Sequence, residues 1–359
     1  MSWQRRVETE HDNIRAALQW SLATAEFEQA FRLGASMARF WARHGYLDEG
    51  WKWLQKLRQH ESEVSPVARA RMLVAVALLA FEIGDQVEVI VAEYALSVFR
   101  ETGDRDEVES CLRLLGMIEN ERGAFDRAAA VLDEAVAIAG QSGDAVREAE
   151  ALRQRGYVEV RRGEYERGIP YLQRSLELLQ QTGARRSVGF GLGHLAQAYL
   201  YQGHSQRAVP MLREAIALVE TAGQSTATAY FRNLIGLALL WPGDYEAAKA
   251  EYHRNLAYSD EIGHRWAVAQ ALIGFGALSI EKGDLQIAAR LLAAAQTFLA
   301  ATVYRLPAAE EAYVQRLLNR LRASMDPTEF ELAWAAGSAL TLKQAIQYAA
   351  SQPSAAARW

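Results

Sequence analysis

Large apolar residues recur along the chain at intervals of about 40 residues, in two interleaved series. The first series is Leu73, Leu112, Leu152, Leu192 and Leu272. The second series is Leu132, Leu172, Leu212, Tyr252 and Leu292. Small residues such as Gly156, Ala196 and Ala208 recur beside them, and small side chains let two helices approach closely. The pattern predicts repeating pairs of helices, with the large residues filling the layer between the two members of each pair.

Glycines divide the chain at the same period. One series has spacings of 39 or 40 residues: Gly84, Gly123, Gly163, Gly203, Gly243 and Gly283. A second series follows it by about 20 residues, at a spacing of 40: Gly103, Gly143, Gly183, Gly223 and Gly263. Glycine favours the left-handed position that ends a helix, and an aspartate after it can cap the next helix. Each interval predicts one helix of about 16 to 18 residues and a tight turn. The whole pattern predicts an all-α fold of stacked antiparallel hairpins.

The spacing of the turns also predicts how the chain is organised. We expect an N-terminal capping helix in residues 1–26, a repeat array in 27–301, C-terminal capping helices in 302–350 and a flexible tail in 351–359. The array should hold about seven hairpins, at 27–60, 67–102, 106–142, 145–182, 185–222, 225–262 and 265–301. Because one hairpin cannot bury both of its faces alone, we expect the array to be a single cooperative solenoid.

Within each unit, the order of small residue, turn, alanine, large residue and alanine resembles the tetratricopeptide repeat, lengthened from about 34 to about 40 residues. This resemblance covers roughly residues 27 to 301 and implies a right-handed α-solenoid. Four shorter segments are similar to the C-terminal repeat region of bacterial STAND-type ATPase transcriptional regulators, the AfsR/LuxR-like ATPases. They are residues 10–20, 200–204, 240–244 and 330–340.

The second resemblance implies a function. It implies a noncatalytic, cytoplasmic sensor or regulatory arm of a signalling ATPase, with a protein or peptide partner in the concave groove of the solenoid. The NTPase domain of such a regulator would be a further possible partner. No Gly-Lys dipeptide occurs in the chain, so a P-loop lysine is absent from its usual setting. We see no helix-turn-helix module outside the array.

The resemblance to tetratricopeptide repeats also implies which positions face the groove: roughly 13, 10, 6, 3 and 2 residues before each turn glycine of the first series. These positions and a close neighbour hold Arg113, Asn120, Arg153, Tyr157, Arg161, Phe190, His194, Gln197, Tyr201, Tyr230, Asn233 and Trp241. Arginine and asparagine can bind a peptide backbone or a carboxylate, while tyrosine and tryptophan give rigid contact area with a polar tip. The alternative is that they are ordinary half-exposed helix residues.

Arg155 interrupts an apolar position. Eight residues before the turn glycine, the other units place Leu115, Leu195, Ile235 and Phe275. A charge in that layer is costly unless it is paired, so we expect an ion pair between hairpins in which Arg155 bridges Glu159 or Glu119. The alternative is that Arg155 extends along its aliphatic stem to solvent.

Composition excludes several classes of protein. With 39 basic and 44 acidic residues the net charge is −5, which argues against nonspecific nucleic-acid binding. A single cysteine, Cys111, rules out a disulfide framework. The longest stretch without a charged residue, Ser187 to Gln206, carries two histidines, three glutamines and four glycines, so no membrane span is expected. Neither HExxH nor GxSxG occurs, and we expect no enzyme, metal or cofactor.

Two other functions stay open at this point. A quorum-sensing peptide receptor also uses lengthened tetratricopeptide repeats, and a free-standing scaffold would oligomerise through its ends. The N-terminal region is rich in aromatic residues: Trp3, Trp20, Phe27, Phe31, Phe40, Trp41, Tyr46, Trp51 and Trp53. Amphipathic spacing predicts that most of them are core, and the rest could form a self-association contact. Arginines between Arg147 and Arg186 could receive an acidic segment or a nucleotide phosphate, although neighbouring glutamates balance them.

Overall fold

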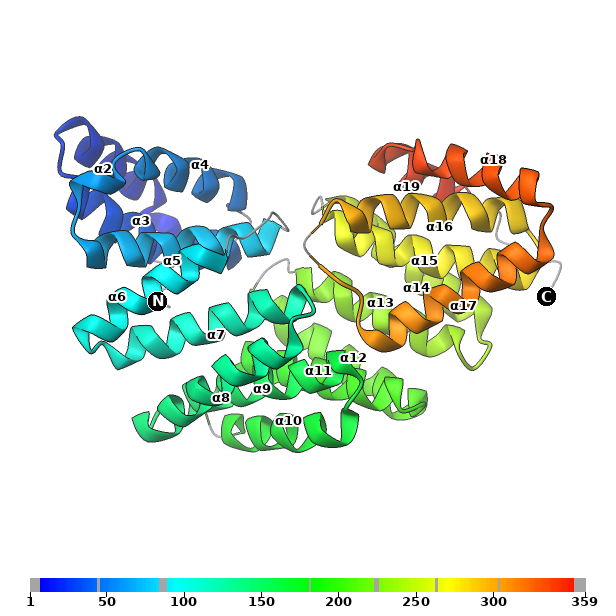
Figure 1. Ribbon diagram of the computed structural model, residues 1–359, viewed down its shortest axis with the longest axis horizontal. Helices are drawn as coiled ribbons and strands as arrows, with labels where there is room; N and C mark the ends of the chain where they lie inside the picture. Colours follow the sequence, from blue (N-terminus) through cyan, green and yellow to red (C-terminus); the bar gives the residue numbers. More distant parts are fainter. Residues whose placement is uncertain are drawn as a thin grey trace. The chain divides into compact units, whose positions relative to one another are not determined.

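The computed structural model describes residues 7–43, 46–83, 89–180, 182–222, 226–261, 264–302 and 304–351. Every regular element in these ranges is a helix, and none is a strand. Figure 1 shows the two helices of a hairpin running side by side, as α15 (Arg265–Lys282) does with α16 (Leu285–Ala300). The all-α class predicted from the period of the sequence is therefore confirmed.

The remaining helices are as follows. The first hairpins are α3 (Phe27–Arg43) with α4 (Leu47–Arg58), α5 (Pro66–Ile83) with α6 (Val89–Thr102), and α7 (Arg105–Glu121) with α8 (Phe125–Ser142). The next are α9 (Ala145–Arg162) with α10 (Tyr165–Leu179), α11 (Arg185–Tyr201) with α12 (Ser205–Val219), and α13 (Thr226–Leu240) with α14 (Tyr245–Glu261). Outside the hairpins lie α2 (His11–Ala23), α17 (Ala308–Ser324), α18 (Pro327–Ser338), α19 (Leu342–Ala350) and the 3-10 turns η1 (Glu61–Glu63) and η2 (Glu220–Ala222).

The chain divides into two compact units. The first unit comprises Met1–Glu119, Asp126–Gly143 and Ala222–Gln224. The second unit comprises Asn120–Phe125, Asp144–Thr221 and Ser225–Trp359. That the whole array unfolds as one cooperative body stays a prediction.

The turn glycines have the backbone that the sequence predicts. Those of the two series that lie in the described residues all have positive φ, from 69° to 98°: Gly103, Gly123, Gly143, Gly163, Gly183, Gly203, Gly243 and Gly283. Gly163 shows the reason, since its amide donates to the carbonyls of Glu159 and Val160 and so closes the last turn of α9. Asp144 caps the start of the same helix by accepting from the amides of Val146 and Arg147. Gly84, Gly223 and Gly263 lie outside the described residues.

Small residues set the distance between the helices of a hairpin. A β-carbon on Gly156 of α9 would lie 2.9 Å from the carbonyl oxygen of Gly168 on α10. A β-carbon on Gly168 would lie 2.7 Å from the carbonyl oxygen of Gly156. Since real side chains do not approach backbone that closely, α9 and α10 pack together only because both positions lack a side chain.

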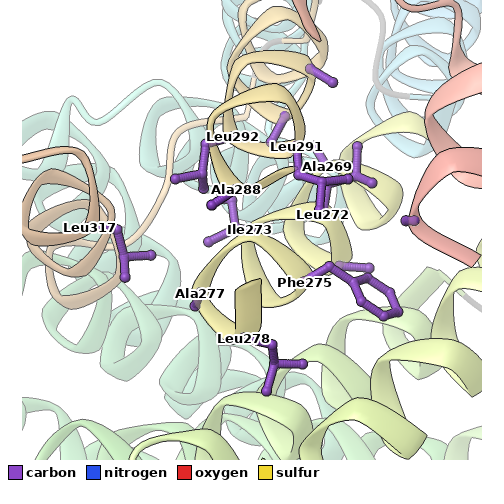
Figure 2. Packing of buried hydrophobic residues seen from close by; sticks show 14 of the residues in the cluster. Ala269, Leu272, Ile273, Phe275, Ala277, Leu278, Ala288, Leu291, Leu292 and Leu317 are labelled. Carbon is purple, nitrogen blue, oxygen red and sulfur yellow. The ribbon is translucent and has the colours of Figure 1, made fainter. Parts of the chain in front are cut away.

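The C-terminal helices complete the apolar core of the second unit. Figure 2 shows apolar side chains of α15 and α16 gathered together, with Leu317 of α17 beside them. Phe330 of α18 and Ile346 of α19 belong to the same buried cluster. A β-carbon on Gly337 of α18 would meet the carbonyl oxygen of Arg290 at 2.2 Å, so α18 lies directly against α16. These helices cover the end of the last hairpin, as expected of capping elements.

The aromatic residues of the first unit are mostly internal. Phe31, Phe40 and Trp41 are fully buried, together with Leu54 and Met72. The side chains of Phe27, Tyr46, Trp51 and Trp53 are half-buried. Trp20 is 58% exposed, and Trp3 lies outside the described residues. Among the described residues, no helix combines the length and the apolar character needed to cross a bilayer.

Candidate partner-binding site

The first helices of successive hairpins bring most of the predicted site residues together in the second unit. Helix α9 carries Arg153, Tyr157 and Arg161; α11 carries Phe190, His194, Gln197 and Tyr201; α13 carries Tyr230 and Asn233, and Trp241 follows it. We call this set the polar face. Asn120 is buried at the end of α7, in the same unit. Arg113 belongs to the first unit, where it forms an ion pair with Glu109 one turn earlier.

Aromatic and cationic groups pack together between α9 and α11. The rings of Tyr157 and His194 stack at 3.9 Å with an interplanar angle of 8°. Arg153 lies with a guanidinium nitrogen 3.4 Å from Nδ1 of His194 and with its charge 5.3 Å from the ring of Phe190. Burial and the charge of Arg153 hold the pKa of His194 well below its usual range. His194 is therefore neutral near pH 7, and its Nδ1 can accept a hydrogen bond from Arg153.

Tyrosines and amides form a buried chain of hydrogen bonds next to this stack. Gln197 donates to the hydroxyl of Tyr201 at 2.8 Å and to the hydroxyl of Tyr230. The hydroxyls of Tyr157 and Tyr230 lie 3.4 Å apart. Burial raises the pKa of all three tyrosines, so each stays protonated and can both donate and accept. These groups can therefore bind a peptide backbone or a carboxylate.

A segment of the chain itself lies on the polar face. Glu310 of α17 is only 8% exposed, and its carboxylate accepts from the hydroxyl of Tyr201 at 2.5 Å and from the amide of Gln270 at 2.8 Å. Burial raises the pKa of Glu310, and the two hydrogen bonds oppose that shift. Asn233 donates to the side-chain oxygen of Gln270 at 3.2 Å and so joins the same network.

The residues before Glu310 use their backbone for contact. Arg161, which is fully buried, pairs with Glu121 and donates to the carbonyl oxygen of Arg305. The amide of Arg305 in turn donates to the carbonyl oxygen of Glu121 at 3.1 Å. One nitrogen of Arg161, a residue that the sequence placed in the groove, therefore donates to a backbone carbonyl that lies 144 residues further along the chain.

Aromatic contacts hold the two ends of this segment. The ring of Tyr304 lies 5.5 Å from Trp266, and the ring of Tyr313 lies 5.9 Å from Trp241 in an edge-on arrangement. We call residues 304–313 the strap. The strap contacts groups on α7, α9, α11 and α15 and the residue after α13, all in the second unit.

Most of the predicted site residues have little exposed surface. Asn120, Arg153, Arg161, His194, Gln197, Tyr230 and Asn233 are buried, and Tyr157, Phe190, Tyr201 and Trp241 are half-buried. Through Arg305 and Glu310 the strap satisfies donors of Arg161 and Tyr201, and the role of the predicted residues in binding a partner stays a prediction. Sequence reasoning missed Gln270, although Gln270 stands 13 residues before Gly283 and so obeys the positional rule. It also missed Glu310, for which the sequence offers only an acidic pair at a helix start.

Arg155 forms one of the two ion pairs that the sequence predicts for it. Arg155 is 6% exposed and donates to Glu159 at 2.6 Å, one turn on in the same helix. Glu119 pairs with Arg127 of α8 at 3.1 Å. The predicted pairing of Arg155 with Glu159 is present, since the i,i+4 spacing in α9 brings the two charges together, and the bridge between hairpins stays a prediction.

Several buried polar atoms of this region have no hydrogen-bond partner within the described part of the chain. They are Nε of Arg153, Oε1 of Gln197, Oδ1 of Asn233, Nε1 of Trp241 and Nε1 of Trp266. A cavity of about 30 Å³ adjoins one of these residues, Asn233, and is also lined by Gln270, Glu310 and Tyr313. Because unpaired buried polar groups are costly, these atoms are available to a ligand that reaches them.

Chemistry of other kinds finds little support in the described residues. No group of three or more histidine, cysteine or acidic side chains gathers there in a way that could hold a metal ion. Burial raises the pKa of the Cys111 thiol to about 12, and a thiol in that state is a poor nucleophile.

Comparison with known proteins agrees with this geometry. Residues 147–221, which cover α9 to α12, match the family model described as "Tetratricopeptide repeat". The chain contains tetratricopeptide repeats. Its fold is similar to that of a Rap protein solved with Competence and Sporulation Factor, with a TM-score of 0.60 and 13% identity over 90% of this chain and 99% of that one. It is also similar to a STAND protein with a tetratricopeptide repeat sensor from Pyrococcus horikoshii, with a TM-score of 0.54 and 14% identity over 94% of this chain and 52% of that one.

Because their sequence identities to this chain are so low, the two structures show similarity of fold alone, and they confirm the solenoid class. A curated protein of Mycobacterium tuberculosis (strain ATCC 25618 / H37Rv), named as an HTH-type transcriptional regulator, is 35% identical over 108 residues. A protein of Mycobacterium bovis with the same kind of name matches equally. The match covers 28% of this chain and spans 12% of the length of each relative.

Proposed function

We propose that the chain is a noncatalytic sensor or regulatory arm of a bacterial STAND-type signalling ATPase or transcriptional regulator, and that it binds a protein or peptide partner on the polar face. One observation carries the proposal. The polar face already binds a peptide segment, the strap, through a backbone carbonyl, a carboxylate and two aromatic contacts. These are the groups by which any extended or helical peptide can be recognised.

The comparisons support the regulatory part of the proposal. One similar structure is a STAND protein whose tetratricopeptide repeats are called a sensor, and the mycobacterial relatives carry the name of HTH-type regulators. In such a protein a ligand acts by binding one conformation of the arm more tightly than another. The size of that preference limits how far the attached domain can be shifted, and a tenfold shift needs about 1.4 kcal/mol.

Peptide selection tests the proposal. Peptides are selected from a displayed random library against the purified chain, and their affinity is measured by fluorescence anisotropy. We expect the double variant Arg153→Ala with Asn233→Ala to bind them at least tenfold more weakly, because both side chains belong to the polar face. Circular dichroism should show that the double variant remains helical.

Arg174 provides a matched control for this experiment. It lies on α10, is more than half exposed and pairs only at the surface with Glu177. Arg174→Ala should bind the selected peptides as the wild type does. Failure of the selection, or equal binding by the double variant, would contradict a binding function of the polar face.

A quorum-sensing peptide receptor is the second candidate. The similar Rap protein was solved with Competence and Sporulation Factor, and this chain spans 99% of that structure's length. The candidate predicts that a free secreted peptide, rather than a segment of a folded protein, binds the polar face with the same dependence on Arg153 and Asn233. Self-association, the mark of a scaffold, would appear as concentration-dependent light scattering.

A further inference from the structure

We propose that the strap is an internal ligand of the polar face, and that the external partner is a peptide segment with an acidic side chain which displaces it. The proposal rests on the binding function proposed above and names the chemistry of the partner. It treats residues 304–313 as an autoinhibitory contact, so that the free chain holds its own recognition groups occupied.

The contacts of the strap define what the partner must carry. Arg161 binds a backbone carbonyl, and Tyr201 with Gln270 binds the carboxylate of a residue five positions later. Trp266 and Trp241 lie against aromatic rings near the two ends. None of these contacts requires that the peptide belong to the same chain, so a separate segment with the same groups fits the same site.

The strap is held by the polar face more than by its own structure. Residues 304–307 are not helical, and the N-cap of α17 is Pro307, whose side chain makes no capping hydrogen bond. The later part of α17 is anchored independently, since Leu317 and Leu321 are buried in the core. The strap can therefore leave the face while α17 keeps its place, because the first turn of a helix frays when its outside contacts are lost.

Several buried polar atoms of the polar face have no hydrogen-bond partner among the described residues, even with the strap in place. Oε1 of Gln197, Oδ1 of Asn233 and Nε1 of Trp241 are buried on the face without a hydrogen-bond partner. In addition, burial raises the pKa of Glu310, which means that the docked carboxylate loses hydration that its two hydrogen bonds only partly replace. A partner that satisfies these further atoms has an advantage over the strap, despite the millimolar effective concentration of a tethered segment.

A peptide added in trans tests the proposal. The probe is a fluorescent, end-capped peptide with the sequence of residues 304–313, and its dissociation constant is measured for the wild type, Glu310→Ala and Glu311→Ala. Glu311 is exposed, so its variant is a control of the same charge at the neighbouring position. We expect at least tenfold tighter binding to Glu310→Ala than to the other two, because only that change weakens the internal competitor.

A second substitution distinguishes competition between the strap and the added peptide from a merely structural role of Glu310. Tyr201→Phe, combined with Glu310→Ala, removes the hydroxyl donor of Tyr201 from the polar face. The peptide should then bind the double variant at least tenfold more weakly than it binds Glu310→Ala. If Glu310→Ala loses helix content, Glu310→Gln removes the charge at nearly constant volume and serves in the same comparison. Equal binding to all variants, or no binding to any of them, overturns the proposal.

The outcome is separable from a failure of the proposed function. Library peptides that bind the polar face while the strap peptide does not would leave the binding function standing and overturn the internal ligand. If no library peptide binds either the wild type or Glu310→Ala, the proposed binding function is contradicted.

Discussion

At the scale of single residues, burial decides the chemistry of this protein. The polar face keeps His194 neutral and its tyrosines protonated, so hydrogen bonding rather than net charge is what it offers a ligand. Arg153 and Arg161 are the exceptions: Arg153 is paired with Glu150, and Arg161 is paired with Glu121 and donates to a backbone carbonyl. The same rule applies to His264 at the start of α15, whose imidazole is buried and also caps the helix.

His264 should make the second unit sensitive to acid. Its Nδ1 accepts from the amide of Ala267 at 3.3 Å, and burial lowers its pKa from 6.5 to about 4. As the pH falls, the unfolded chain binds a proton at His264 before the folded chain does. The free energy of unfolding should therefore decrease by about 1–3 kcal/mol as the pH falls from 6.5 toward 4. His264→Asn keeps a capping oxygen but does not titrate.

Urea unfolding at pH 7.5 and pH 4.5 checks this expectation. The wild type should lose more free energy of unfolding between the two conditions than His264→Asn does. Equal losses would mean that His264 does not contribute to the acid sensitivity.

At the scale of helices, the glycines explain both the success and the limits of sequence reasoning. Helix ends were predictable because a left-handed glycine and a capping aspartate act within one turn, as Gly163 and Asp144 do. The strap was not predictable, because Arg161 and Arg305 lie 144 residues apart and no local pattern links them. The pairing of Arg155 with Glu159 was predictable because the two residues are four positions apart in one helix.

Two glycines of adjacent hairpins should respond oppositely to alanine. Gly168→Ala places a β-carbon 2.7 Å from the carbonyl oxygen of Gly156, so it should destabilise the chain by about 1–3 kcal/mol. Gly140 is helical and exposed, and nothing lies within 4 Å of its added β-carbon. Gly140→Ala should therefore stabilise the chain by about 0.5–1 kcal/mol.

Chemical denaturation measures both variants under the same conditions. The account requires opposite signs for the two changes in unfolding free energy. Loss of stability in both variants, or in neither, would show that the close approach of α9 and α10 is not what makes Gly168 necessary.

At the scale of the whole molecule, the repeated hairpins supply a surface of polar and aromatic groups. Each of several successive first helices contributes polar groups to the site, so we expect recognition to be distributed over α9, α11, α13 and α15. A distributed surface suits a regulatory arm, because a ligand that spans several hairpins can favour one arrangement of them. The proposed partner and the strap use the same groups, which couples binding to the position of the C-terminal segment.

Hydrogen exchange measured by mass spectrometry, with and without a selected peptide, detects both peptide binding on the polar face and release of the strap. We expect slower exchange in α9, α11, α13 and α15 on binding, together with faster exchange in residues 304–310. Slower exchange confined to α10, α12 and α14, with residues 304–310 unchanged, would contradict it.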